Sequence, residues 1–244
     1  MAYAMTHLII ANEFAKFNQI ENKDLFLLAS IAPDAVHARS DFELPMKAKC
    51  HFMQEGQRWG EMYEEVPMQI WYDRLHKIYK ERLKLAQNEK DVIFWKGYLV
   101  HLLADVFNCQ LMYAPDLIKH GLDVSKFRVK YREECIRQDA FLFQVYPESK
   151  EILASLERAM RDEMSEDIME HLQLQDFFSL KNLCDNTNFQ VRMFSEYEPV
   201  TLEGQEMITL ERTEYFLRHV LEESKRLLYD FPDCGRTFKV PENI

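Results

Sequence analysis

Residues 97–109 of this chain read GYLVHLLADVFNC, and this stretch decides the predicted fold. Its apolar residues lie nearly all round a helix, which is typical of a helix buried inside a protein. His101 and Asp105 are four residues apart, so an imidazole and a carboxylate project from one face of that helix. An unpaired carboxylate costs several kcal/mol in such a place, so Asp105 needs a partner. A metal ion, a salt bridge or a buried His–Asp hydrogen bond would each provide one.

The rest of the chain has the composition of an all-α protein. Only six Gly and eight Pro occur in 244 residues, and segments with helical spacing of apolar residues recur throughout. The length suits a single domain spanning residues 1–244. We expect helices over residues 6–17, with Thr6 as the cap, and over 22–31, 51–63, 67–87, 91–109, 126–146, 150–164, 168–183 and 203–229. We expect loops at 35–49 and 186–199, a short turn at 116–119 closed by Gly121, and an irregular tail from 231.

Charge and cysteine content exclude several classes of function. The formal net charge of −11 provides no basic field, so we expect no nucleic-acid partner. The five Cys residues are odd in number and form no CxxC motif, which argues against disulfides and a thiolate zinc site. The N-terminus lacks the features of a secretory signal, and its apolar run is too short to span a bilayer. We expect a cytoplasmic protein without stable membrane insertion, and the oligomeric state stays open.

Three further residues stand out because of where they lie. His7 falls in the first turn of the first predicted helix. Asp34 follows Pro33, which biases the preceding residue out of the helical region and so ends the second helix. His51 comes at the end of the polar segment 35–49. Taken singly, each has an ordinary explanation: a first-turn histidine, a helix cap and an imidazole at the edge of the core.

The order of these residues resembles that in a known enzyme family. The motifs THLIIA (6–11), SIAPDAVH (30–37), KAKCHF (47–52) and GYLVHLLAD (97–105) are similar to those of the zinc-dependent phospholipase C family, all-α bacterial enzymes that cleave phospholipid head groups. The resemblance covers about the first 110 residues and implies a cluster of metal ligands. They are His7, Asp34, His51, His101 and Asp105. On this basis the metal-ligand part spans about 1–115, and about 116–244 is a helical extension.

The resemblance implies a metal-dependent hydrolase of a phosphoester, with Asp34 as candidate general base. A pair of metals would clamp the phosphate and activate a water, with Asp105 bridging them. The family's terminal-amine ligand comes from a Trp that begins the mature chain, whereas Met1 lies six residues before His7 here, so this sequence gives no support for that ligand. Leu111 stands where a further His is expected, and no His-x-x-x-Glu follows. We therefore expect one or two ions. Nitrogen and oxygen donors suit Zn²⁺ without excluding Fe, Mn or Ni. Because the sequence does not support these further family ligands, we expect the substrate to be a small, soluble phosphoester and not a bilayer lipid.

Several alternatives remain at this point. An HD-type nucleotide phosphohydrolase is also all-α, but it requires a His-Asp dipeptide, and none of the eight histidines is followed by Asp. A helical interaction module with a structural or vestigial metal site would carry the same residues. His37 is either a residue that orients a ligand or touches phosphate, or a surface histidine. The aromatic residues Trp59, Tyr63, Trp71 and Tyr72 either line a substrate cleft or belong to the core.

Overall fold

The computed structural model describes residues 3–57, 59–120 and 124–229, and within these ranges the chain is helical with no strand. The all-α prediction is confirmed. The α-helices are α1 (Ala4–Phe17), α2 (Lys23–Ala29), α3 (Leu44–Cys50), α4 (Glu65–Leu85), α5 (Glu89–Asn108), α6 (Ala114–His120), α7 (Val124–Val145), α8 (Ser149–Asp162), α9 (Glu166–His171), α10 (Leu180–Glu196) and α11 (Leu210–Tyr229). Two 3₁₀ segments, η1 (Ala32–Ala38) and η2 (Trp59–Glu61), and a π-helical segment, η3 (Cys109–Tyr113), connect some of them.

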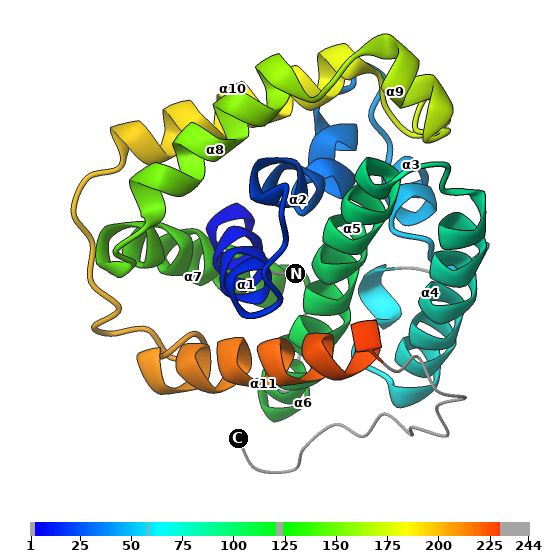
Figure 1. The fold of residues 1–244 in the computed structure, drawn as a ribbon. Helices are drawn as coiled ribbons and strands as arrows, with labels where there is room; N and C mark the ends of the chain where they lie inside the picture. Colours follow the sequence, from blue (N-terminus) through cyan, green and yellow to red (C-terminus); the bar gives the residue numbers. More distant parts are fainter. Residues whose placement is uncertain (1–2, 58, 121–123, 230–244) are drawn as a thin grey trace.

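Helix α5 is the central element of the molecule. It packs against α1, α2, α4 and α11, while α8 and α10 lie along one side of the molecule and α11 along the opposite side (Figure 1). The continuous helical rod Glu89–Lys119 is long and apolar enough to cross a membrane, but 89% of its most apolar window is buried inside the protein. Such burial is typical of the core helix of a soluble protein. Buried side chains of the helices α1 through α11 form the hydrophobic core. The core thus includes residues on both sides of position 115, where the expected metal-ligand part ends.

Close packing of α2 against α5 depends on Gly97. A Cβ atom at this position would overlap the backbone oxygen of Phe26 and lie 2.8 Å from the Cβ of Ala29. Gly97, His101 and Asp105 follow at intervals of four residues, so they share one face of α5. The glycine therefore brings α2 against the face that carries the two candidate ligands.

Two predictions for the segment between α2 and α4 are wrong. The expected loop at 35–49 is irregular only at 39–43, because residues 35–38 belong to η1 and residues 44–49 to α3, which has Pro45 in its first turn. Residues 51–63 were expected as a helix, but the described residues of this range form turns and irregular segments together with η2 at Trp59–Glu61. The cause lies at Phe52, whose φ of 57° is left-handed. The Met53 and Phe52 N–H groups bond the carbonyls of Ala48 and Lys49, a Schellman ending that turns the chain out of the helix.

Other differences lie at the start and in the second half of the chain. Thr6 lies inside α1 rather than capping it. Residues 168–183 are split between α9 and α10, and α10 continues to Glu196 through the expected loop at 186–199. The buried side of α10 includes the polar residue Thr187. A polar residue on the buried face interrupts the helical spacing of apolar residues from which a helix is predicted. Residues 116–119 continue the rod as α6, whereas Gly121 and the tail from 231 lie outside the described residues.

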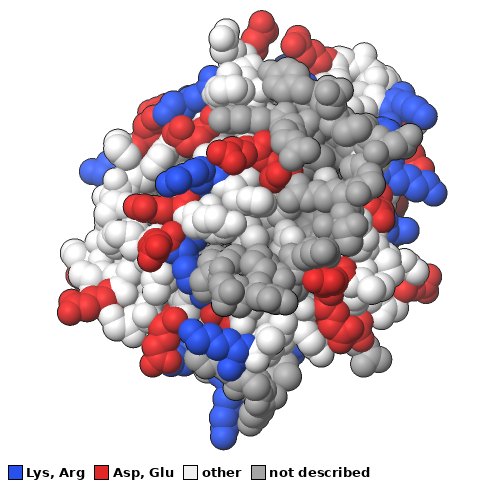
Figure 2. Space-filling model, turned by 90° about the horizontal axis from the view of Figure 1, so that it is seen from below, with Lys and Arg blue, Asp and Glu red and all other residues white. Residues whose placement is uncertain are grey.

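Charges are mixed over the face shown in Figure 2. Asp and Glu side chains are interspersed with Lys and Arg over the described part of that face. With a net charge of −11, this face offers phosphate backbones no broad basic area. The absence of a nucleic-acid partner stays a prediction.

Candidate metal centre

The fold brings the five predicted ligands together from four elements. His101 and Asp105 lie on α5, His7 on α1, Asp34 on η1 and His51 directly after α3. In two groups the candidate ligand atoms lie within 4.8 Å of one another. The groups are His7, His101 and Asp105, and Asp34, His51 and His101. Because His101 belongs to both, the groups form one continuous centre, and metal binding by it stays a prediction.

Backbone carbonyls fix the orientation of two imidazoles. The Nδ1 atom of His101 lies 2.8 Å from the Ser30 carbonyl, and that of His51 lies 2.9 Å from the Lys47 carbonyl. A carbonyl only accepts, so each Nδ1 carries the hydrogen and donates it. The two Nε2 atoms face each other at 3.2 Å. If both rings are neutral, two lone pairs face each other there, and a cation between or beside them would remove the repulsion.

Asp105 completes the buried end of the centre. Its Oδ1 lies 3.5 Å from His7 Nε2, and its Oδ2 lies 3.5 Å from His51 Nε2 and 3.8 Å from His101 Nε2. The His7 ring stacks on that of His101 at 3.8 Å between centroids. Both nitrogens of His7 are buried and make no hydrogen bond to the described residues. A metal ion would give His7 Nε2 the partner that a buried polar atom requires.

The protonation states suit metal ligation. Burial lowers the pKa of His101 well below its usual range and also lowers the pKa of His51, so both imidazoles stay neutral. Neutral imidazole and ionised carboxylate are the forms that bind metals. The residues present therefore fit a divalent ion.

Asp34 forms the solvent-facing end of the centre. Its Oδ1 lies 3.6 Å from His51 Nε2, and its side chain is 23% exposed. Burial raises its pKa, but the Lys47 ammonium group outweighs this and holds the pKa well below its usual range. His37, the candidate ligand-orienting residue, lies beside it, with Nε2 3.4 Å from Asp34 Oδ1 and 40% of its side chain exposed.

Lys47 is the site residue that sequence analysis missed. Its side chain is only 3% exposed, its Nζ donates to Asp34 Oδ1 at 2.8 Å, and it lies 3.1 Å from His37 Nε2. Lysine only donates, so the His37 nitrogen accepts and the proton sits on Nδ1. Within KAKCHF, the sequence signal that distinguishes Lys47 from the exposed Lys49 is its four-residue spacing from His51, the residue that follows the short helix α3.

Neighbouring elements hold His51 in place. Its carbonyl accepts the indole N–H of Trp71 at 2.7 Å, and the Cys50 carbonyl accepts the Tyr98 hydroxyl at 2.7 Å. Trp71 is fully buried in the core, so it is no cleft-lining residue. Trp59 instead packs edge-on against His51, with ring centroids 5.4 Å apart.

The first helix is anchored from a distance. The carboxylate of Asp139, on α7, accepts the Met5 N–H at 2.8 Å and the Thr6 N–H at 2.9 Å. The Thr6 hydroxyl also donates to it. This carboxylate satisfies helix N-terminal N–H groups that a side chain at the start of α1 would otherwise cap. It thereby fixes the turn of α1 that carries His7.

No thiol of the described residues joins the centre. The Cys50 thiol donates to the carbonyls of Pro33 and Lys47, both at 3.2 Å, and burial raises its pKa. Leu111, at the position where the phospholipase family carries a further His, is buried on η3. Among the described residues, the candidate donors are therefore nitrogen and oxygen atoms.

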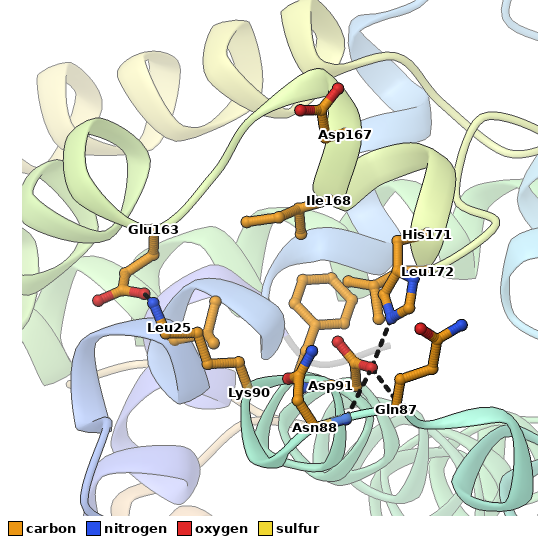
Figure 3. A pocket seen from close by; sticks show the side chains of 11 residues that line it. Leu25, Gln87, Asn88, Lys90, Asp91, Glu163, Asp167, Ile168, His171 and Leu172 are labelled. Atoms are coloured by element: carbon orange, nitrogen blue, oxygen red, sulfur yellow. Dashed lines mark hydrogen bonds and ion pairs between the residues drawn. The ribbon is translucent and has the colours of Figure 1, made fainter.

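A separate cleft of about 420 Å³ lies between the start of α5 and the α8–α9 region (Figure 3). His171 of α9 contacts Asp91 of α5, with Nε2 and Oδ2 2.6 Å apart. Asp91 also accepts backbone N–H groups at the start of α5, so its carboxylate is occupied as a helix cap. A Lys90–Glu163 ion pair lines the cleft too. None of the five candidate ligands lines it.

Comparisons of the chain with family models, with curated proteins and with solved structures give no match. The resemblance to zinc-dependent phospholipase C therefore rests on the quoted motifs and on the convergence of the residues they contain.

Proposed function

We propose that this protein is a metal-dependent hydrolase of a phosphoester, with one or two divalent ions held by His7, Asp34, His51, His101 and Asp105. The observation that carries the proposal is the pair of inward-facing Nε2 atoms of His51 and His101, 3.2 Å apart and surrounded by two carboxylates. Zn²⁺ is the first candidate, and Fe, Mn and Ni also suit these donors.

The proposed chemistry assigns different tasks to the two ends of the centre. A bound divalent ion supplies Lewis acidity and a water made nucleophilic near neutral pH. His7, His101 and Asp105, at most 1% exposed, hold the ion and exclude bulk water. Asp34, which is partly exposed, receives the proton of the attacking water at its carboxylate, the general-base role. We place the substrate on this side because the other ligands are buried.

We propose a small, soluble substrate. The net charge of −11 repels anionic bilayers at long range, and the exposed part of the centre is limited to Asp34 and His37. The test is turnover of p-nitrophenyl phosphodiesters and soluble head-group esters, with and without chelator, against turnover of phosphatidylcholine vesicles. Chelator-sensitive turnover of the soluble esters supports the proposal. Robust vesicle hydrolysis contradicts its soluble-substrate part.

A structural metal site in a helical interaction module is the second candidate. The burial of His7, His51, His101 and Asp105 favours it, because closed sites are typical of structural metals. The two candidates differ in the assay above. Bound metal that raises stability, with no metal-dependent turnover of any phosphoester, would select the structural role. An HD-type nucleotide hydrolase has no supporting observation beyond the all-α fold.

A further inference from the structure

Lys47 is an unusual neighbour for a metal centre. It is a cation, yet its side chain is 3% exposed and lies beside the proposed ligand Asp34. Removing an ammonium group from water costs several kcal/mol unless it is well paired. Asp34 pairs with Lys47 in this structure. A metal ion bound by Asp34, His51 and His101 would compete with Lys47 for the same carboxylate. Lys47 therefore needs a further reason to be buried there.

Counting charges indicates what the loaded centre would bind. Metal ligation uses the carboxylates of Asp34 and Asp105 and the neutral imidazoles of His51 and His101. Together with the Lys47 ammonium group, which pairs with Asp34, these groups carry one net negative charge. One divalent ion reverses it to one net positive charge, and a second ion increases it further. A buried site with a net positive charge is stabilised by a counter-ion. The metal-loaded centre would therefore favour an anionic ligand.

Two hydrogen-bond donors beside the centre are uncommitted. The ammonium of Lys47 has three N–H groups, of which the carboxylate of Asp34 and the imidazole of His37 take one each. The indole N–H of Trp59 is buried and has no hydrogen-bond partner among the described residues. Lys47 Nζ lies over the Trp59 ring, 5.3 Å from its centroid, so the two side chains are neighbours. A buried N–H without an acceptor costs about 1–3 kcal/mol, which an oxyanion would remove.

We propose that Lys47 is a substrate-binding residue whose ammonium group, together with the indole N–H of Trp59, holds an oxygen of the phosphoryl group beside the metal ions. This inference rests on the proposed function and assigns the substrate's anionic oxygen to the solvent-facing end of the centre. His37 accepts from Lys47 and so positions the ammonium group. Lys49 on the same helix is exposed and directed to the Asp176 carbonyl, which makes it a matched control.

The test is binding of inorganic phosphate to the Zn²⁺-loaded full chain, measured by isothermal titration calorimetry, with metal content determined on the same samples. Lys47→Met is expected to keep its zinc and to lose phosphate affinity by roughly 10- to 100-fold, the range for one charged hydrogen bond. Lys47→Arg is expected to retain part of the affinity, and Lys49→Met all of it. Equal phosphate affinity in wild type and Lys47→Met, at equal zinc content, would overturn the inference.

A second measurement covers the case in which Lys47→Met does not fold or load. Trp59→Phe keeps the ring and removes only the N–H, so it is expected to hold zinc and to bind phosphate several-fold more weakly. In ¹⁵N-lysine-labelled wild type, the Nζ signal that is absent from Lys47→Arg is expected to shift on adding phosphate. An unchanged signal together with unchanged affinity of Trp59→Phe would overturn the inference.

Further binding and turnover measurements distinguish the possible ligands, and they distinguish the Lys47 inference from the hydrolase proposal. Methyl phosphate and dimethyl phosphate distinguish a monoester from a diester site, and acetate tests whether any anion suffices; acetate binding as tightly as phosphate would count against a phosphoryl site. If phosphate binds through Lys47 but no ester is hydrolysed, the inference holds and the hydrolase proposal fails. If esters are hydrolysed while Lys47→Met binds phosphate normally, the inference alone fails.

Discussion

The Nε2 atoms of His51 and His101 face each other at 3.2 Å, while the Nδ1 atom of each ring bonds a backbone carbonyl. The two rings come from positions fifty residues apart in the chain. Their orientation leaves two acceptor atoms in contact inside the protein, beside two carboxylates. A divalent cation bound there would make this arrangement favourable.

Because His101 belongs to both ligand groups, its loss has the widest effect. His101→Ala is expected to remove all bound metal, whereas His7→Ala removes metal only from the group that contains His7. Elemental analysis of each purified variant measures this. His76→Ala, on α4 and outside both groups, is the control and should keep the wild-type metal content. Full metal content in His101→Ala would contradict the assignment.

Removal of the metal should destabilise the fold. Metal at about 1,000 times its Kd stabilises the protein by about 4 kcal/mol, and for a chain of this size each kcal/mol corresponds to roughly 2–4 °C in Tm. We therefore expect a chelator to lower Tm by roughly 8–16 °C. Differential scanning calorimetry before and after chelation checks this. His101→Ala should melt at the same temperature in both conditions.

Gly97→Ala is expected to lower both stability and metal affinity. The new methyl group would overlap the Phe26 carbonyl, and overpacking of this kind costs about 1–3 kcal/mol. Displacement of α2 would also move the Ser30 carbonyl, which orients His101. Denaturant unfolding and a zinc titration measure the two effects. Gly204→Ala, where a methyl group meets no atom within 4 Å but φ is 79°, should lower stability by about 1–2 kcal/mol without changing zinc affinity.

Asp139 should make stability depend on pH. Burial raises the pKa of this carboxyl to about 6 from an ordinary value of 3.8, against the opposing effect of the N–H donors of Met5 and Thr6. The folded protein then binds more protons than the unfolded chain between those two pH values, so this group's contribution to stability falls as pH rises through that window. The fall is on the order of 3 kcal/mol.

The variant Asp139→Asn isolates that contribution. It cannot ionise, so the difference between its unfolding free energy and that of wild type should change between pH 4 and pH 6. Both proteins are measured with chelator present, so that metal release does not add its own pH dependence. An offset of about 1 kcal/mol is also expected from the weakened cap of α1. A difference that is constant with pH would contradict the raised pKa.

Much of the fold could be predicted from the sequence because its helices are long and periodic. The predicted helix at 91–109 matches α5 closely, because a nearly continuous apolar pattern of this length is typical of a buried helix. The segment 35–63 could not be predicted. Its short helix α3 buries only Lys47 and Cys50, and the left-handed Phe52 stands where glycine is the usual residue.

The five candidate ligands were predicted from the order of the motifs that contain them, because each residue taken singly has an ordinary explanation. The structure places their ligand atoms in two groups that share His101. Lys47 was missed because a lysine in a polar segment normally lies in water. Asp139 was missed for another reason. It caps a helix 133 residues earlier in the chain, and local sequence carries no sign of such a contact.

Elemental analysis of the full chain, purified without added metal, tests the central claim most directly. The account predicts one or two equivalents of Zn, Fe, Mn or Ni in the wild-type protein, removed by chelator and absent from His101→Ala. A wild-type protein that contains no such metal, takes up none when Zn²⁺ is added, and melts at the same temperature with and without chelator would contradict it.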